Sequence, residues 1–97
     1  MYRVIAGNNT GKTYRLLKEC GEHNGLYVCE HPERAGEKCS AYGLPIVKAI
    51  GFHDWARIAR DVEGAVDVSM DVYIDELEKF VKYFIPFLKG YTLTNDD

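Results

Sequence analysis

Apolar residues in this chain form short runs, which alternate with segments where they recur every three to four positions. Short runs rich in β-branched and aromatic residues, bounded by glycine, proline or acidic residues, are typical of buried strands. Five such runs predict five strands, at residues 2–6, 26–30, 46–50, 72–74 and 91–94.

The segments between these runs carry helical spacing and helix boundary signals. They predict four helices, at residues 11–22, 33–42, 55–62 and 77–88. Pro32 stands where a first helical residue belongs, and Gly43 and Pro45 follow the end of the same helix. Pro86 is expected to kink or shorten the last helix, because proline cannot donate a helical hydrogen bond.

Strands that alternate with helices of about ten residues favour a parallel sheet joined by crossovers, with helices on both faces. We therefore expect a single domain over residues 1–97, a three-layer α/β/α sandwich with a mainly parallel five-stranded sheet. Ligands bind such sheets beyond the carboxyl ends of the strands. Residues 7–13, 75–76 and 95–96 are predicted to gather there.

The 97 residues, 46% of them hydrophobic, suffice for one core, and 12 basic against 15 acidic residues give a formal charge of −3. This balance excludes a global field that attracts nucleic acid or an anionic membrane, although a local basic patch could still act. No run of 18 apolar residues occurs. We expect a soluble cytoplasmic protein without membrane contact.

Three cysteines, Cys20, Cys29 and Cys39, are an odd number and form no CxxC pair. Buried reduced thiols fit this arrangement better than a disulfide framework. Cys20 with His23, or Cys29 with His31, could begin a metal site, but a second pair at zinc-like spacing is missing.

The stretch AGNNTGKT, residues 6–13, lies between the first predicted strand and the first predicted helix. Glycine lets a backbone approach phosphate oxygens, and a helix N-terminus adds unpaired amide groups and partial positive charge. Lys12 is predicted to reach the β- and γ-phosphates and Thr13 to ligate Mg²⁺. The residues predicted to bind the nucleotide are Gly7, Asn8, Asn9, Thr10, Gly11, Lys12 and Thr13. The alternative is a Gly-Asn turn in which Thr10 caps the helix.

An acidic pair, Asp75 and Glu76, follows the apolar strand in MDVYIDEL. Nucleotide hydrolysis needs a carboxylate beside the metal and a group that orients the attacking water. Asp75 is the candidate magnesium-side acid and Glu76 the candidate base. The alternative is an acidic pair that only favours the dipole at a helix start.

Residues 6–13 and 72–76 resemble the Walker A and Walker B motifs of P-loop NTPases. A glutamate directly after the Walker B aspartate, here Glu76 after Asp75, resembles the pattern of the division that includes AAA+, RecA-like and helicase ATPases. About 15 residues carry this resemblance. It implies a minimal, phage-type, single-domain version, located in the host cytoplasm if a phage encodes it. It also implies that Thr94 or Asn95 senses the γ-phosphate, and Asn95 is the residue we expect to take part in catalysis with Lys12 and Glu76.

The resemblance implies that the chain binds Mg²⁺ and ATP, or another NTP, with slow or partner-stimulated hydrolysis. A protein partner or self-association is expected, and nucleic acid only through a partner or a local patch. Arg57 and Arg60 share one predicted helix and could act in trans as an arginine finger, although solvated surface arginines are commoner.

Two other functions remain open. A non-enzymatic module could use nucleotide binding to gate a partner, which the small size favours and the intact motif residues disfavour. A nucleoside or nucleotide kinase is the second, because IDE also resembles the Walker B region of thymidine kinases. Against it, 97 residues leave little chain for an acceptor site, and the paired zinc cysteines of those enzymes are missing.

Overall fold

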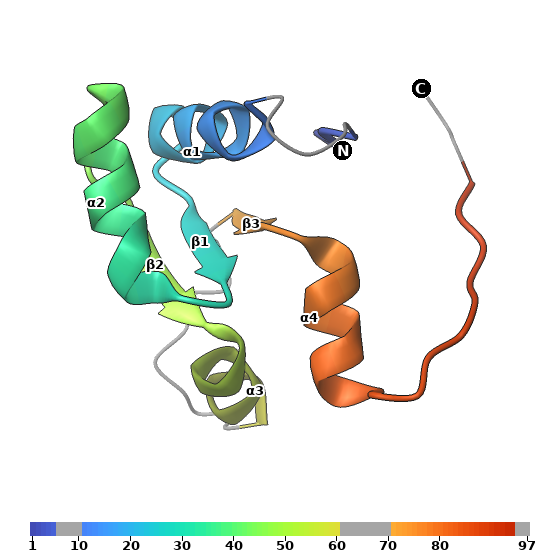
Figure 1. Cartoon of the computed structure of the whole chain (residues 1–97). Coiled ribbons are helices and arrows are strands. Elements are labelled where there is room, and N and C mark those ends of the chain that lie inside the picture. The colour runs from blue at the N-terminus through green and yellow to red at the C-terminus, as the bar shows by residue number, and fades with distance from the viewer. Residues whose placement is uncertain (6–10, 61–70, 95–97) are drawn as a thin grey trace.

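The computed structural model describes residues 1–5, 11–60 and 71–94, and three parallel strands form its sheet (Figure 1). Helices and strands alternate in the order α1 Lys12–Glu22, β1 Leu26–Cys29, α2 Pro32–Tyr42, β2 Lys48–Gly51, α3 Phe52–Arg60, β3 Val72–Ile74 and α4 Leu77–Phe84. The strand order is β2-β1-β3, and both neighbours run parallel to β1. Strand β1 is therefore the central strand of the described sheet.

Every residue of β1 is buried, which explains its continuous apolar run LYVC. Successive side chains of a strand point to opposite faces. Leu26 and Val28 accordingly belong to one core cluster, and Tyr27 and Cys29 belong to the other. The central strand thus requires a helical layer on each face.

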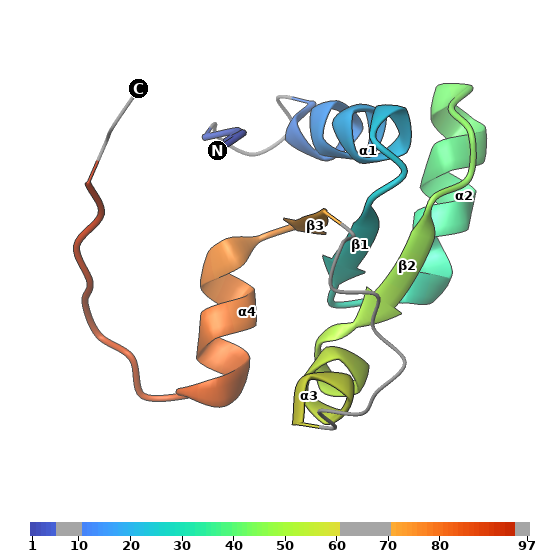
Figure 2. The same ribbon diagram turned by 180° about the vertical axis from the view of Figure 1, so that it is seen from behind.

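Helices α1 and α2 lie on one face of the sheet and helices α3 and α4 on the other (Figures 1 and 2). Helices α1 and α2 pack Leu17, Cys20, Ala35 and Cys39 against the face that carries Tyr27. Helices α3 and α4 pack Phe52, Trp55 and Phe80 against the opposite face. All three cysteines are buried and unpaired, as expected for reduced thiols.

The helix ends follow local backbone chemistry. Helix α2 has a proline in its first turn and ends at Tyr42, and the next residue, Gly43, has a φ of 71° in the left-handed region that favours glycine. Helix α4 ends at Phe84, two residues before Pro86, so the proline shortens it as expected. No helix of the described residues is long and apolar enough to span a bilayer.

The predicted five-stranded sheet is wrong, because two of its strands do not form. Residues 2–5 and 91–94 are irregular, while residue 6 of the first run lies outside the described residues. Ile5 is 81% exposed and Leu93 is 65% exposed, so neither segment packs as a buried strand. Arg3 Nη1 instead donates to the carbonyl oxygen of Thr94 over 3.4 Å. Apolar character makes a strand only where a neighbouring strand can pair with it.

Candidate functional site

The acidic pair lies directly beyond the carboxyl end of β3, beside the central strand. The backbone amide of Asp75 donates to the carbonyl of Val28 over 2.9 Å, which continues the β1–β3 pairing by one residue. Parallel strands end at the same edge of a sheet, so Asp75 lies next to the end of β1. Glu76 then precedes the first residue of α4.

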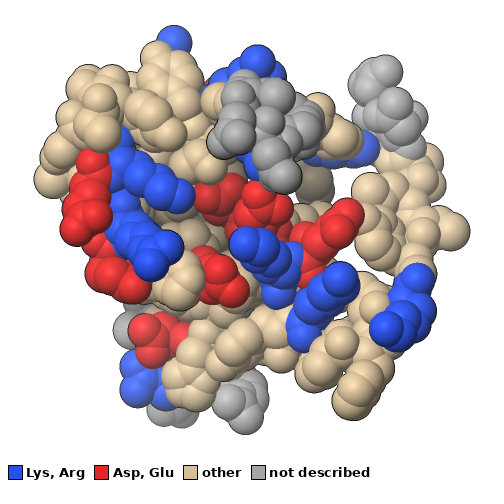
Figure 3. Space-filling view, viewed as in Figure 1, with Lys and Arg blue, Asp and Glu red and all other residues tan. Residues whose placement is uncertain are grey.

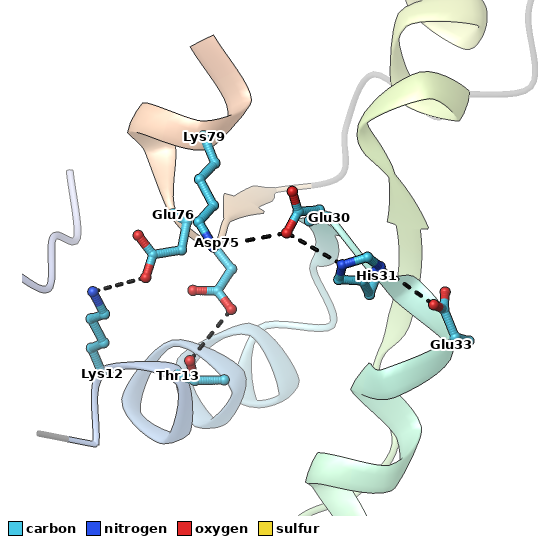
Figure 4. Close-up of polar contacts among 8 residues, drawn as sticks. All are labelled: Lys12, Thr13, Glu30, His31, Glu33, Asp75, Glu76 and Lys79. Carbon is cyan, nitrogen blue, oxygen red and sulfur yellow. Dashed lines mark hydrogen bonds and ion pairs between the residues drawn. The ribbon is translucent and has the colours of Figure 1, made fainter. Parts of the chain in front are cut away.

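The first turn of α1 faces this acidic pair (Figure 4). The ammonium of Lys12 lies 2.8 Å from Oε1 of Glu76. The hydroxyl of Thr13 donates to Oδ2 of Asp75 over 3.4 Å. The structure therefore brings together four of the predicted site residues, two from each motif.

Gly11, before α1, and Glu76, before α4, both have left-handed backbone conformations. Gly11, which precedes α1, has a φ of 78°, and no side chain caps the helix. Glu76 has a φ of 62°, a left-handed conformation that is uncommon for residues other than glycine. Such conformations cost about 1–3 kcal/mol and persist where the surrounding structure holds them. In Glu76 this conformation accompanies the ion pair with Lys12.

The ion pair between Lys12 and Glu76 is partly open to water, with the two side chains 25% and 38% exposed. The hydrogen bond from Lys12 to Glu76 raises the pKa of the lysine, and the charges of Glu76, Asp75 and Glu78 act in the same direction. Lys12 is thus cationic at neutral pH, as a phosphate-binding group must be.

Asp75 has a further partner from the central strand. The hydroxyl of Tyr27 donates to its Oδ2 over 2.7 Å, and Tyr27 is only 2% exposed. Burial, followed by the charge of Asp75 and this hydrogen bond, raises the pKa of Tyr27 strongly. The phenol is therefore the donor in this hydrogen bond at neutral pH.

A hollow of about 190 Å³ opens between the acidic pair and α2. Its walls include Thr13, Tyr27, Asp75 and Glu76, together with residues that end or follow β1 or belong to α2 and α4. The second group comprises Cys29, Glu30, His31, Ala35, Lys38 and Lys79. Basic and acidic side chains stand next to one another on this face (Figure 3).

Glu30 is the acidic residue at the end of β1, and it lies between two nitrogen groups (Figure 4). Its Oε1 is 3.3 Å from Nε2 of His31 and 3.8 Å from Nζ of Lys79. Nδ1 of His31 lies 3.5 Å from Oε1 of Glu33. All four side chains are 47% or more exposed, so the rim of the hollow is solvated.

Thr13 and Asp75 offer two oxygens of the kind that Mg²⁺ prefers, and an ion at this place would need most of its ligands from elsewhere. Within residues 1–5, 11–60 and 71–94, no group of three or more His, Cys, Asp or Glu side chains could hold a metal. Mg²⁺ prefers six oxygens at 2.0–2.1 Å, so adjacent ligands are about 2.9 Å apart. The oxygens of Thr13 and Asp75 are 3.4 Å apart, somewhat more than this distance between adjacent ligands. Phosphate oxygens and water would have to complete the shell.

Other predicted site residues lie elsewhere. Gly7, Asn8, Asn9, Thr10 and Asn95 lie outside the described residues. Arg57 is 72% exposed and lies 3.4 Å from Asp54 of its own helix, which is the ordinary arrangement of a surface arginine. The side chain of Arg60 is not among those described.

Sequence reasoning missed the contribution of the central strand to the site. Tyr27 and Glu30 were assigned to a strand, but their position beside Asp75 depends on β1 and β3 being neighbours. The available signal was that successive side chains of a strand point to opposite faces, which places Tyr27 and Cys29 of LYVC on the same face.

No protein-family model, curated protein or solved structure matches this chain significantly.

Proposed function

We propose that this protein binds a magnesium nucleoside triphosphate, ATP or another NTP, and hydrolyses it slowly or when a partner stimulates it. One observation carries the proposal: Lys12 and Thr13 in the first turn of α1 contact Glu76 and Asp75 after β3. A phosphate-binding lysine, a hydroxyl and two carboxylates are the groups that phosphoryl chemistry needs at one place.

Phosphate binding is supported by the start of α1. The first amide groups of a helix have no partners within it, and their dipoles favour an anion. Lys12 adds a full positive charge at the same point. A polyphosphate would replace Glu76 as the partner of Lys12, because the present pair is partly solvated and several phosphate oxygens offer more negative charge.

Magnesium binding is supported by the oxygen pair of Thr13 and Asp75. Bound at this place, the ion would neutralise charge on the phosphates during transfer. Thr13 and Asp75 would hold its shell on the protein side, and phosphate oxygens would hold the other. Asp75 is kept in position by Tyr27, which lies in the core.

Hydrolysis is favoured over transfer to an organic acceptor by the size of the hollow. Pockets for organic ligands usually measure about 300–1,000 Å³. The hollow beside Asp75 measures about 190 Å³, which is below this range and leaves little room for an organic acceptor. Glu76, once separated from Lys12, would orient the attacking water as a base.

A second candidate function is a nucleotide-gated interaction module. Glu76 immediately precedes α4, so an event that separates Glu76 from Lys12 acts directly on the start of that helix. Tyr83 and Phe84 of α4 are 47% and 45% exposed, which leaves aromatic surface for a protein partner or a second copy. Binding without turnover would favour this function.

Thermal unfolding with Mg-ATP, Mg-ADP and a non-hydrolysable ATP analogue tests the proposal. A ligand at about a hundred times its Kd adds about 2.7 kcal/mol, which raises the Tm of a domain this small by about 10–20 °C. Lys12→Ala should abolish the shift, whereas Lys18→Ala, an exposed lysine of the same helix, should keep it. A wild-type Tm that no nucleotide changes would overturn the proposed function.

A further inference from the structure

Tyr27 is a buried aromatic residue of the core, and its hydroxyl reaches the candidate site. Its ring packs in the cluster formed by α1, α2 and the central strand, which contains Leu17 and Cys39. Because the side chain is 2% exposed, the surrounding residues determine where the hydroxyl points. It points to Oδ2 of Asp75, 2.7 Å away.

The choice of partner distinguishes this hydroxyl from an ordinary buried phenol. A buried tyrosine needs some hydrogen-bond acceptor, and a backbone carbonyl would serve. Tyr27 instead donates to a carboxylate that lines the hollow, and Thr13 donates to the same oxygen. Two hydroxyls, one from the core and one from the first turn of α1, therefore determine where the Asp75 carboxylate lies.

We propose that Tyr27 is a positioning residue for the magnesium nucleotide: its hydroxyl holds the Asp75 carboxylate toward Thr13 and thereby sets the affinity for Mg²⁺. This inference rests on the proposed function. Tyr27 need not touch nucleotide or metal. Groups that hydrogen-bond to metal ligands typically change metal affinity by about 10-fold to 100-fold when removed.

The test compares Tyr27→Phe with Tyr73→Phe, and each substitution removes only a hydroxyl oxygen. Tyr73 is the matched control because it pairs in register with Tyr27 on the neighbouring strand β3 and packs against the same cluster. Binding of a fluorescent non-hydrolysable ATP analogue is measured against Mg²⁺ concentration, and again in EDTA. In Tyr27→Phe the Mg²⁺ concentration for half-maximal binding should rise about 10-fold, with metal-free binding unchanged. Tyr73→Phe should behave as wild type.

Two results would overturn the inference while leaving nucleotide binding intact. One is a wild-type Mg²⁺ midpoint in Tyr27→Phe, and the other is an equal loss of binding with Mg²⁺ and with EDTA, which indicates general structural damage. A wild type that binds no nucleotide would instead overturn the proposed function itself.

If Tyr27→Phe does not unfold cooperatively, the wild type provides a second measurement. The hydroxyl proton of Tyr27 is buried and should be visible by NMR. Adding Mg²⁺ to the nucleotide-bound wild type should shift this proton, and the same addition to Asp75→Asn should not. An unchanged proton in the wild type would count against the inference.

Discussion

The ammonium of Lys12 and the carboxylate of Glu76 form a 2.8 Å ion pair that joins the first turn of α1 to the residue before α4. This pair engages the lysine that we propose to bind phosphate. On that proposal a nucleotide would compete with Glu76 for Lys12, so binding of the nucleotide would be coupled to release of the glutamate. Removing the charge of Glu76 is therefore expected to raise the affinity for the nucleotide and to lower the rate of turnover.

Glu76→Gln should bind the non-hydrolysable ATP analogue severalfold more tightly than wild type, because a neutral amide competes less well for Lys12. Turnover should fall by about 100-fold or more, since a positioned base usually contributes that much. Calorimetry measures the affinity, and single-turnover phosphate release measures the rate.

Glu37→Gln is the control for this pair of effects, because Glu37 is an exposed glutamate of α2 away from the ion pair. It should leave both affinity and rate unchanged. Turnover at the wild-type rate in Glu76→Gln would show that another group orients the water.

Asp75→Asn should remove the dependence of nucleotide binding on Mg²⁺. The amide oxygen can still accept from Tyr27, so the fold should persist, but a neutral ligand binds Mg²⁺ weakly. In wild type the Tm shift should be larger with Mg-ATP than with ATP and EDTA, and in the variant the two shifts should be equal. Asp54→Asn, an exposed aspartate of α3, should retain the wild-type difference. A persistent Mg²⁺ effect in Asp75→Asn would exclude Asp75 from the ion's surroundings.

Gly25 and Gly36 should respond oppositely to alanine. A Cβ at Gly25 would lie 2.6 Å from Cε1 of Tyr73 and 3.0 Å from the carbonyl oxygen of Asp71, so Gly25→Ala should destabilise by about 1–3 kcal/mol. A Cβ at Gly36, inside α2, has no neighbour within 4 Å. Gly36→Ala should stabilise by about 0.5–1 kcal/mol. Urea unfolding measures both, and equal effects would contradict the close packing at Gly25.

Two buried thiols should make the fold sensitive to alkali. Burial raises the pKa of Cys20 and Cys29 from 9.0 to about 11. The unfolded chain loses these protons near pH 9.0, but the folded chain keeps them up to about pH 11. The contribution of the two thiols to the free energy of unfolding is therefore complete below pH 9. It is lost as the pH rises toward 11, by up to about 1.4 kcal/mol per pH unit for each thiol.

The slope of unfolding free energy against pH, measured in urea from pH 8 to 10, tests this sensitivity. Cys20→Ala should flatten the slope above pH 9, whatever its effect on stability at pH 8. The window ends at pH 10 because Tyr27 and Lys12, whose pKa values are also raised, contribute beyond it. Identical slopes for wild type and variant would contradict the assigned burial of the thiol.

The sequence predicted those features that depend on a residue's own chemistry or its near neighbours. Pro32 and Gly43 mark the ends of a helix by their backbone geometry, as the structure shows. Lys12 and Asp75 stand out in the sequence because phosphate and metal chemistry needs such side chains, and their roles stay predictions. The contact between Tyr27 and Asp75 was not predictable in this way. It exists because β1 and β3 are neighbours, which is a property of the sheet and not of either run.

The predictions of strands at residues 2–6 and 91–94 were wrong for the same reason, because an apolar run does not contain the strand with which it would pair. Leu93→Ala therefore tests the three-stranded sheet directly. Leu93 is 65% exposed, so its truncation should change the free energy of unfolding by less than about 0.5 kcal/mol. Leu17→Ala is the comparison, because Leu17 is 1% exposed in the core between α1 and the sheet, and its truncation should cost about 2–5 kcal/mol. Urea unfolding measures both variants. A loss of 2 kcal/mol or more in Leu93→Ala would mean that the leucine is buried in the folded protein, and that residues 91–94 pack with the sheet after all.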